Sequence, residues 1–420
     1  MRYLNRLVFH IDVNSAFLSW EAARIVKDKG EDIRLIPSVI GGDPGKRTGV
    51  VLAKSIPAKK LGIRTGEPLS TALRKCPDLF IAHPDFALYE KNSRAFMEIC
   101  AKYTPVLEKF SIDECFLDMS GTSKIYPDPI KTAYDIKDEI KSTLGFTVNV
   151  GVGSNKLLAK MASDFEKPDK VHTLFSSEVE EKLWPLRVGE LFGVGASTAS
   201  RLERSYIYTV GDIARRSLRS IQALLGVKLG RTVYDFAWGK DDSPVNGESE
   251  EAKGYSISTT LENDLTDIES ARAVLLTLAD SVCARMRADG VLAGCVGVTL
   301  RSSDFKNFSH QKKIPEPTDI TSEIYGVSEK LLSELWRDDL PVRLVGLSLT
   351  SLTDDSNMQI DMFDNGEKEK SRRLDKTLDD IRNRFGSTTV VRGASYRKDV
   401  RVGKKYDARI RSKNGENKDK

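Results

Sequence analysis

Two adjacent acidic residues lie inside an apolar run of this chain. The stretch SIDECFLD (residues 111–118) contains Asp113 and Glu114, and the run VFHIDVN contains Asp12. Both runs have the composition of buried strands, where an unpaired carboxylate is strongly unfavourable. Divalent cations offset clustered carboxylates, and Mg²⁺ prefers oxygen ligands. Two such ions about 3.5–4 Å apart can stabilise both the attacking and the leaving oxygen of a phosphoryl transfer.

The alternative is that each acid lies at a strand edge and points to water. If residues 111–118 form one extended strand, Asp113 and Glu114 point to opposite faces of it. Only one of them could then face the core of a single sheet. The presence of acids in two such runs favours the metal site.

Composition limits the class of protein. With 420 residues, 40% hydrophobic and 30% charged, the chain is typical of a soluble globular protein with two to four domains. A net charge of +4 permits a polyanionic partner without requiring one. Five scattered cysteines without CxxC pairs favour neither a disulfide framework nor a zinc site, and they suit a reducing cytoplasm. No signal peptide or membrane span is expected.

The first part of the chain predicts an α+β layer in which strands alternate with helices. We expect strands at residues 7–14, 111–118 and 146–154, and two strands within 35–55. We expect helices at residues 15–26, 86–103, 130–144 and 155–165.

Beyond residues 168–172 the pattern changes to short helices with glycine turns. Residues 190–204 predict a helix, a Gly-Val-Gly hairpin and a second helix, and residues 224–239 are a looser copy. A polar linker follows, and then a second α+β domain. Its expected strands are 255–264, 293–305 and 342–352, and its expected helices are 268–288 and 321–337. The polar tail 404–420 is expected to be disordered.

Four motifs in order resemble a known family. HIDVNSAFLSWE, FSIDECFLDMSG, VGVGSNKLLAKMASDFEKP and the LFGVG hairpin are similar to those of the Y-family, translesion DNA polymerases. The similarity is strong over residues 1–240, extends by architecture over 250–350, and is closest to the DNA polymerase IV (DinB-type) branch. It implies an α+β, multidomain right-hand fold with a palm, small fingers, a helical thumb and a little-finger domain.

The resemblance also suggests domain boundaries. They are palm 1–14 and 82–168, fingers 15–81, thumb with helix-hairpin-helix 169–238, linker 239–253, little finger 254–353 and C-terminal extension 354–420.

The same resemblance assigns roles to the acidic residues. Asp12, Asp113 and Glu114 would be catalytic and would hold two Mg²⁺ ions, with the backbone carbonyl of Val13 as a further ligand. Phe17, five residues after Asp12, would be the steric gate that excludes a ribose 2′-hydroxyl. The alternative is that Phe17 is only a core residue, with Leu18 or Trp20 better suited to the gate.

Basic residues are the candidates for triphosphate contact. Lys156 and Lys160 are four apart near the start of a helix, where an anion is favoured, and Lys156 is the better candidate. The alternative is a solvated lysine face. In the fingers, KSIPAKK departs from the family pattern, with Ile56 at the usual tyrosine and Lys59 at the usual arginine. Lys59 supplies charge without the bidentate fork of arginine.

Two further segments indicate macromolecular partners. The hairpin at Gly193 and Gly195 would bind DNA phosphates through its backbone amides. MQIDMFD (358–364) resembles the peptide by which bacterial polymerases dock on the sliding clamp, through Gln359, Met362 and Phe363. The alternative is that this peptide packs on the little finger as an extra strand.

We therefore expect a monomeric, cytoplasmic enzyme that extends a primer on template DNA with deoxynucleoside triphosphates. The resemblance implies low fidelity and translesion synthesis, and no second acidic constellation suggests a proofreading exonuclease. One rival is a palm-type nucleotide cyclase, although GGDPG (41–45) reads as a turn and not as a cyclase signature. The other rival is a noncatalytic DNA-binding scaffold, which would be expected to lose at least one of the three acids.

Overall fold

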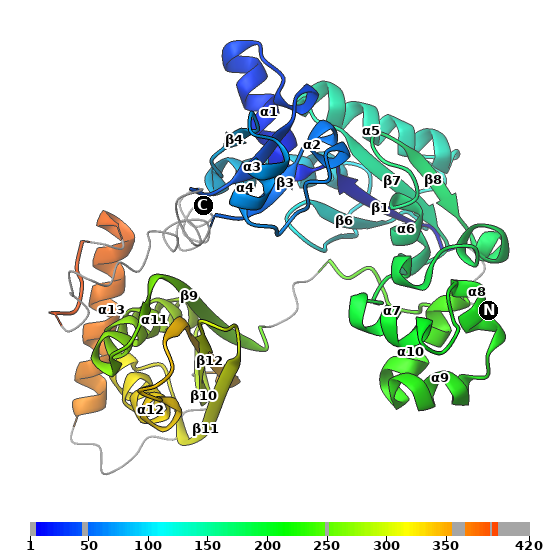
Figure 1. Cartoon of the computed structure of the whole chain (residues 1–420). Coiled ribbons are helices and arrows are strands. Elements are labelled where there is room, and N and C mark those ends of the chain that lie inside the picture. The colour runs from blue at the N-terminus through cyan, green and yellow to red at the C-terminus, as the bar shows by residue number, and fades with distance from the viewer. Residues whose placement is uncertain (1–5, 44–48, 248–251, 355–365, 387–388, 394–420) are drawn as a thin grey trace. The chain divides into compact units, whose positions relative to one another are not determined.

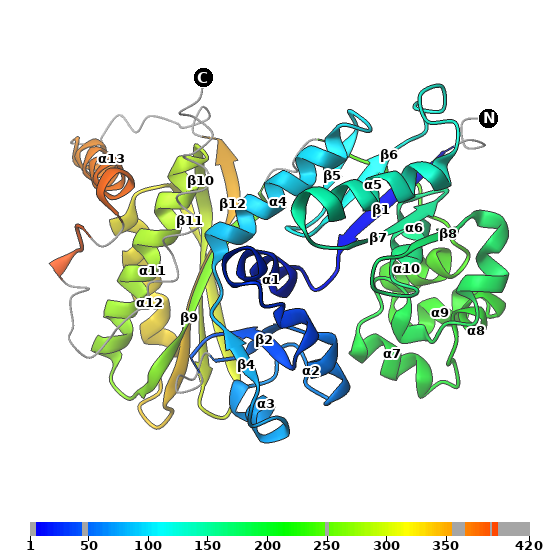
Figure 2. The same ribbon diagram turned by 90° about the horizontal axis from the view of Figure 1, so that it is seen from above.

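A computed structural model describes residues 6–43, 49–247, 252–354, 366–386 and 389–393. The chain divides into two compact units, one formed by residues 1–42 together with 50–249, and the other mainly by residues 250–420. Figures 1 and 2 show both from two directions. Among the described helices, none combines the length and the apolar character needed to cross a bilayer.

A five-stranded sheet forms the centre of the first unit. Its strand order is β5-β6-β1-β7-β8. β1 is antiparallel to both β6 and β7, and β8 runs parallel to β7. The strands are β1 (Val8–Val13), β5 (Leu107–Lys109), β6 (Glu114–Asp118), β7 (Val148–Gly153) and β8 (Val171–Leu174).

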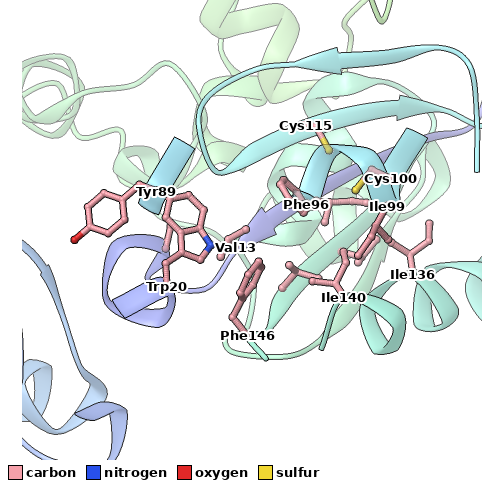
Figure 3. Close-up of a cluster of buried hydrophobic side chains, with 14 of the residues drawn as sticks. Val13, Trp20, Tyr89, Phe96, Ile99, Cys100, Cys115, Ile136, Ile140 and Phe146 are labelled. Atoms are coloured by element: carbon pink, nitrogen blue, oxygen red, sulfur yellow. The ribbon is translucent and has the colours of Figure 1, made fainter. Parts of the chain in front are cut away.

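One face of this sheet packs against a large apolar core. The helices around it are α1 (Ala16–Lys29), α4 (Phe86–Ala101) and α5 (Pro129–Leu144). Odd-numbered positions of β1, such as Phe9 and Ile11, point into this core and are fully buried. Trp20, Phe96 and Phe146 fill the space between the helices and the sheet (Figure 3). This core fixes the orientation of β1 and β6.

The opposite face of the sheet carries α6 (Lys156–Ser163). Gly151 and Gly153 of β7 make this close approach possible. A Cβ atom at Gly151 would lie 2.0 Å from the Ala159 carbonyl oxygen, and one at Gly153 would lie 2.5 Å from the Ala159 nitrogen. These are backbone atoms, so a flexible side chain could not relieve the clash.

A smaller three-stranded sheet, of order β3-β2-β4, belongs to the same unit and has its own core. β2 pairs antiparallel with β3 and parallel with β4. Its elements are β2 (Ser38–Gly41), β3 (Val51–Lys54), β4 (Phe80–Ala82), the short helices α2 (Ile56–Lys60) and α3 (Leu69–Lys75), and the neighbouring 3₁₀ turn η1 (Ile33–Leu35).

Short helices around a separate apolar core follow the five-stranded sheet. Gly193 has φ +82° and Gly195 caps α7, so the hairpin predicted at LFGVG is present, although a 3₁₀ turn precedes it. The elements are η2 (Ser176–Glu178), η3 (Val179–Leu183), η4 (Val188–Glu190), α7 (Ala196–Glu203), α8 (Val210–Arg215), α9 (Leu218–Leu225) and α10 (Val227–Ala237).

The first part of the expected linker is attached to the five-stranded sheet. Asn155 donates to the carbonyl of Gly239, and the amide of Asn246 donates to Glu108 at 2.7 Å. Between them, Val245 is buried in a small cluster with Val8 and Phe116. Residues 239–247 therefore pack along the strands that carry the acidic residues, and are not a free spacer.

The second unit contains a four-stranded antiparallel sheet of order β11-β10-β12-β9. Its apolar core lies between the sheet and α11 and α12. Figure 2 shows these two helices on one face of the sheet. The elements are β9 (Gly254–Leu265), α11 (Ile268–Ala288), β10 (Val291–Ser302), β11 (Asn307–Thr318), α12 (Thr321–Leu335) and β12 (Val342–Asp354).

A last helix, α13 (Glu367–Phe385), packs on α11 mainly through charged side chains. Asp375 is buried and accepts a hydrogen bond from the Thr321 amide at 2.8 Å. Ion pairs join Arg287 to Asp375 and Asp379, Arg382 to Asp280, Arg392 to Asp280 and Asp375, and Arg372 to Asp319. Leu374 and Phe385 of the same helix remain exposed.

The predicted α+β, multidomain fold is confirmed, with corrections to individual elements; β4, β5 and β8, for example, were not expected. The strand expected at 111–118 begins only at Glu114, so Asp113 precedes the strand and the alternation proposed for 111–113 is wrong. β11 was not predicted, because its polar residues and two prolines do not suggest a strand; it is an edge strand, where proline is tolerated. Gln359, Met362, Phe363 and the tail lie outside the described residues.

The contact between α6 and β7 predicts a strong effect of one methyl group. Gly151→Ala should lower the free energy of unfolding by about 3 kcal/mol, because the new Cβ meets backbone atoms of α6. Gly121→Ala is the control, since a Cβ there meets nothing within 4 Å. Urea unfolding of both variants measures the difference, and equal stability of the two would contradict this packing.

Candidate active site

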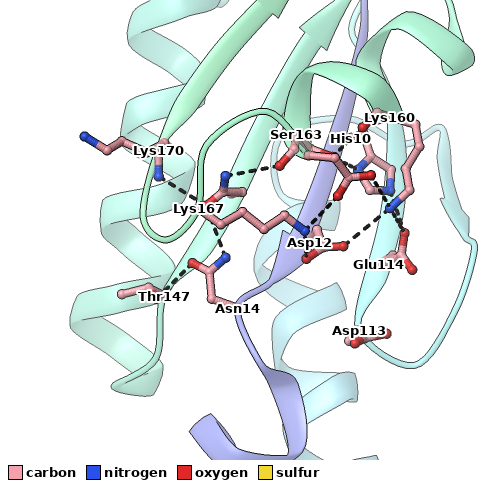
Figure 4. A network of polar contacts seen from close by, with 12 residues as sticks. His10, Asp12, Asn14, Asp113, Glu114, Thr147, Lys160, Ser163, Lys167 and Lys170 are labelled. Carbon is pink, nitrogen blue, oxygen red and sulfur yellow. Dashed lines mark hydrogen bonds and ion pairs between the residues drawn. The ribbon is translucent and has the colours of Figure 1, made fainter. Parts of the chain in front are cut away.

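Strand register brings two of the acidic residues side by side. Asp12 lies directly opposite Glu114 in the antiparallel pairing of β1 with β6. Directly opposed residues of neighbouring strands point to the same face of a sheet. Both carboxylates therefore lie on the face covered by α6, where their side chains are 13% and 18% exposed (Figure 4).

Asp113 lies next to this pair, just before β6 begins. Its carbonyl accepts a hydrogen bond from the amide of Val13 at 3.0 Å, which ties the end of β1 to residue 113. The Ser111 hydroxyl donates to the Asp113 carboxylate at 2.7 Å. The structure thus brings together Asp12, Val13, Asp113 and Glu114, as the sequence motifs suggested.

Two lysines supply positive charge to the acids. The Lys160 ammonium lies 2.6 Å from Oε2 of Glu114 and 3.5 Å from Oδ2 of Asp12. Lys167 contacts Oδ1 of Asp12 at 2.9 Å. Both lysines also contact Asp164, at 3.4 and 2.9 Å. Lys160 comes from α6, and its position depends on the close packing of that helix against β7.

The electrostatic balance differs between the acids. Burial alone would raise the pKa of Glu114, but hydrogen bonds from His10 and Lys160 lower it to about 2. Burial raises the pKa of Asp113, and the charges of Asp12 and Glu114 raise it further. Burial would lower the pKa of Lys160, yet its bond to Glu114 raises it overall. Hydrogen bonds and positive charge thus offset the burial of the Glu114 carboxylate, whereas the burial of the Asp113 carboxylate is not offset.

The other predicted nucleotide contacts lie apart from the acids. Lys156 pairs with Glu108 at 2.6 Å, and its ammonium lies 4.9 Å from the ring centre of Phe116. Lys59 is exposed on α2. Burial lowers the pKa of nearby Lys54, and the charge of Lys59 lowers it further.

Phe17 lies in the first turn of α1 and is partly exposed. Its ring stacks on Tyr89 with the centroids 4.5 Å apart and the planes 9° apart. Leu18 and Trp20, the other candidates for the gate, are 1% and 0% exposed, so neither could touch a nucleotide.

Sequence reasoning missed two contributors. Lys167 was not singled out, although its position in DFEKPDK, just after the lysine-rich helix, could have suggested it. His10, two residues before Asp12, shares the face of β1 that carries the acids, and its ring contacts Glu114 at 3.0 Å. Its only signal in the sequence is the period of two along the strand.

The unequal compensation predicts opposite effects of two isosteric changes in metal-free protein. Glu114→Gln should lower the free energy of unfolding by about 1–3 kcal/mol, because Lys160 loses its charged partner. Asp113→Asn should leave it unchanged or raise it by up to about 1 kcal/mol, because repulsion from Asp12 and Glu114 is relieved. Urea unfolding at pH 7 with a chelator measures both; equal losses would contradict the electrostatic account.

Comparison with known proteins agrees with this architecture. The sequence model of the impB/mucB/samB family matches residues 11–164, that of its C-terminal domain residues 252–362, and that of the DNA polymerase-iota thumb domain residues 189–241. DNA polymerase IV of Clostridium acetobutylicum is 43% identical over 398 residues, covering 94% of this chain and all of that protein. DNA polymerase IV of Clostridium kluyveri is 36% identical, covering 94% and 99%.

A solved structure is also similar. The Y-family DNA polymerase chimera Dbh-Dpo4(243-245)-Dbh matches with a TM-score of 0.71 and 27% identity, covering 83% of this chain and all of the chimera. The resemblance inferred from the four motifs is confirmed. The chain belongs to the Y-family of DNA polymerases, in its DNA polymerase IV (DinB-type) branch.

Proposed function

We propose that this protein is a template-directed DNA polymerase that adds deoxynucleotides to a primer 3′ end in translesion synthesis. The observation that carries the proposal is the register that places Asp12 opposite Glu114, with Asp113 beside them, in a chain that is 43% identical to a DNA polymerase IV. We further propose that synthesis is of low fidelity and without proofreading, and that the enzyme acts as a cytoplasmic monomer.

Y-family polymerases depend on divalent metal ions, and the residues here suit such an ion. The side chains are carboxylates, the oxygen ligands that Mg²⁺ prefers. The Lys160 ammonium already lies between Asp12 and Glu114, which identifies a position where a cation is favoured. Among the described residues, no three Asp, Glu, His or Cys side chains yet converge closely enough to hold a metal.

We assign the metal ligands as Asp12, Asp113, Glu114 and the carbonyl of Val13, for two Mg²⁺ ions. When bound, such ions promote attack by the primer hydroxyl and neutralise charge on the triphosphate. The carboxylates would hold the ions in a fixed position, because they are attached to or next to rigid strands. The ammonium groups of Lys160 and Lys167 contact the same acids. Once metal ions neutralise these carboxylates, both ammonium groups would be available to contact the negatively charged triphosphate.

Lys156 and Lys59 remain candidates for triphosphate contact. Lys156 would have to exchange its bond to Glu108 for a phosphate, so we rank it below Lys160 and Lys167. Lys59 is exposed near Lys54, and together they give the fingers positive charge in place of the usual arginine. We propose Phe17 as the steric gate, held flat against Tyr89.

The domain assignments follow from the same family membership. We propose residues 1–14 and 82–168 as palm, 15–81 as fingers, 169–238 as thumb and 254–353 as little finger. Gly193 and Gly195 would bring backbone amides close to DNA phosphates without reading sequence. Docking of Gln359, Met362 and Phe363 on a sliding clamp is proposed from the sequence alone.

The rival functions suit the chain less well. A nucleotide cyclase would not need the hairpin helices of residues 189–241 or the second unit. A noncatalytic scaffold would not need to keep Asp12, Asp113 and Glu114 together on one site. Neither alternative has a feature in its favour that the polymerase lacks.

Primer extension with labelled primer-template, the four deoxynucleotides and Mg²⁺ tests the function. Asp113→Ala should reduce extension by at least about 10³-fold, because the charge alignment of the reacting groups is lost. DNA affinity should remain close to that of the parent, since thumb and little finger would supply most DNA contacts. Substantial extension by the variant would remove Asp113 from the site, and no extension by the parent protein would refute the function.

The position of Phe17 predicts a change in sugar choice. Phe17→Ala should increase ribonucleotide incorporation relative to deoxynucleotide, because the ring no longer collides with the 2′-hydroxyl. Single-nucleotide insertion with each sugar measures the ratio. Phe86→Ala, which alters a neighbouring ring in the same aromatic cluster, is the matched control. If both variants shift the ratio equally, Phe17 acts only through packing.

A further inference from the structure

His10 is a buried polar side chain for which the proposed reaction gives no role so far. It lies on β1, directly opposite Phe116 on β6 and Gly151 on β7, and its side chain is fully buried. A buried histidine in a strand commonly serves only packing, and its ring does lie 4.6 Å from that of Phe116. Burial requires polar partners for the ring nitrogens, so the identity of these partners decides the role of His10.

Both nitrogens of His10 have such partners. Nε2 lies 3.0 Å from Oε2 of Glu114, and Nδ1 lies 2.7 Å from the hydroxyl of Ser163 at the end of α6 (Figure 4). An ionised carboxylate can only accept, so Nε2 donates to Glu114. The Ser163 hydroxyl that contacts Nδ1 also donates to the carbonyl of Lys160 at 2.8 Å, so it links the ring to the backbone of α6.

These contacts orient the Glu114 carboxylate. Oε2 receives hydrogen bonds from His10 and Lys160, whereas Oε1 faces the hydroxyl of Ser111, 3.4 Å away, which also contacts Asp113. Lys160 is a flexible side chain shared among Glu114, Asp12 and Asp164. The imidazole ring, in contrast, is fixed by a central strand on one side and by Ser163 on the other.

We propose that His10 is a positioning residue, which holds Glu114 through Nε2–H···Oε2 so that Oε1 stays directed toward Asp113 for binding of a divalent cation. The proposal rests on the proposed function, since it assigns a role to His10 within the same site. Partners that hydrogen-bond to metal-binding carboxylates fix ligand orientation, and their loss typically weakens metal binding by about 10–100-fold.

Manganese affinity, measured by electron paramagnetic resonance on the full chain with primer-template and without nucleotide, tests this directly. His10→Leu removes both polar contacts at similar bulk and should weaken Mn²⁺ binding at least about tenfold. His10→Gln, which keeps one N–H donor, should recover most of the affinity. The Mg²⁺ concentration for half-maximal extension should rise in parallel, while DNA affinity stays unchanged.

Two further variants separate positioning from folding. Ser163→Ala removes only the hydroxyl that orients the ring, and should weaken Mn²⁺ binding in the same direction by a smaller factor. His172→Leu changes a histidine on β8, whose ring contacts the Glu166 carbonyl, and should bind Mn²⁺ like the parent. If His10→Leu does not fold, His10→Gln and Ser163→Ala decide the question.

If His10→Leu binds Mn²⁺ as tightly as the parent, the proposal is overturned and His10 is only a core residue. If His10→Leu does not fold, the same result for Ser163→Ala overturns it. The proposal is also overturned if the parent protein itself binds no Mn²⁺. Neither result depends on extension, so failure of the polymerase function, seen as an inactive parent enzyme, is distinguished from failure of the positioning role.

Discussion

The side-by-side placement of Asp12 and Glu114 is the constraint on which the rest of this site depends. Two carboxylates held opposite each other in a strand pair repel, and neither is more than about one-fifth exposed to water. Such an arrangement persists only with a cation nearby. In the isolated chain Lys160 and Lys167 supply the positive charge, and Lys160 reaches both acids because α6 lies directly on β7.

The same constraint explains the asymmetry of the five-stranded sheet. One face is an ordinary apolar core of aromatic and branched side chains, which fixes the strands. The other face omits side chains at Gly151 and Gly153 and places polar residues at His10 and Asp12. Attachment of residues 239–247 along these strands, through Asn155 and Glu108, adds further contacts to the same region. The apolar face therefore keeps the strands rigid, and the polar face carries the residues of the candidate active site.

Much of this could be predicted from the sequence, because acids in apolar runs and ordered motifs are strong signals. The helices at 130–144 and 268–288 were predicted nearly to the residue, since their apolar periodicity is regular. Three features could not be predicted. Asp113 precedes its strand because the chain bends at Ser111. The strand β11 contains two prolines and many polar residues, which do not indicate a strand. The partners of Lys156 and Lys167 depend on tertiary contacts. The local sequence pattern of a strand determines which face of the sheet a side chain points to. The partner of a long charged side chain depends on segments that are distant in the sequence.

The attachment of α13 through ion pairs has a thermodynamic consequence. The heat-capacity change on unfolding rises with the apolar surface exposed, and the denaturant slope rises with the total surface exposed. α13 buries Asp375 and pairs Asp379 and Arg382, while Leu374 and Phe385 stay 54% and 71% exposed. Asp375 is the one buried residue of α13, so release of this helix would uncover little fully buried apolar surface of the helix itself. Detachment of α13 would thus change chiefly the pairing of charges, because it separates Asp375 and Asp379 from Arg287 and Arg382 from Asp280.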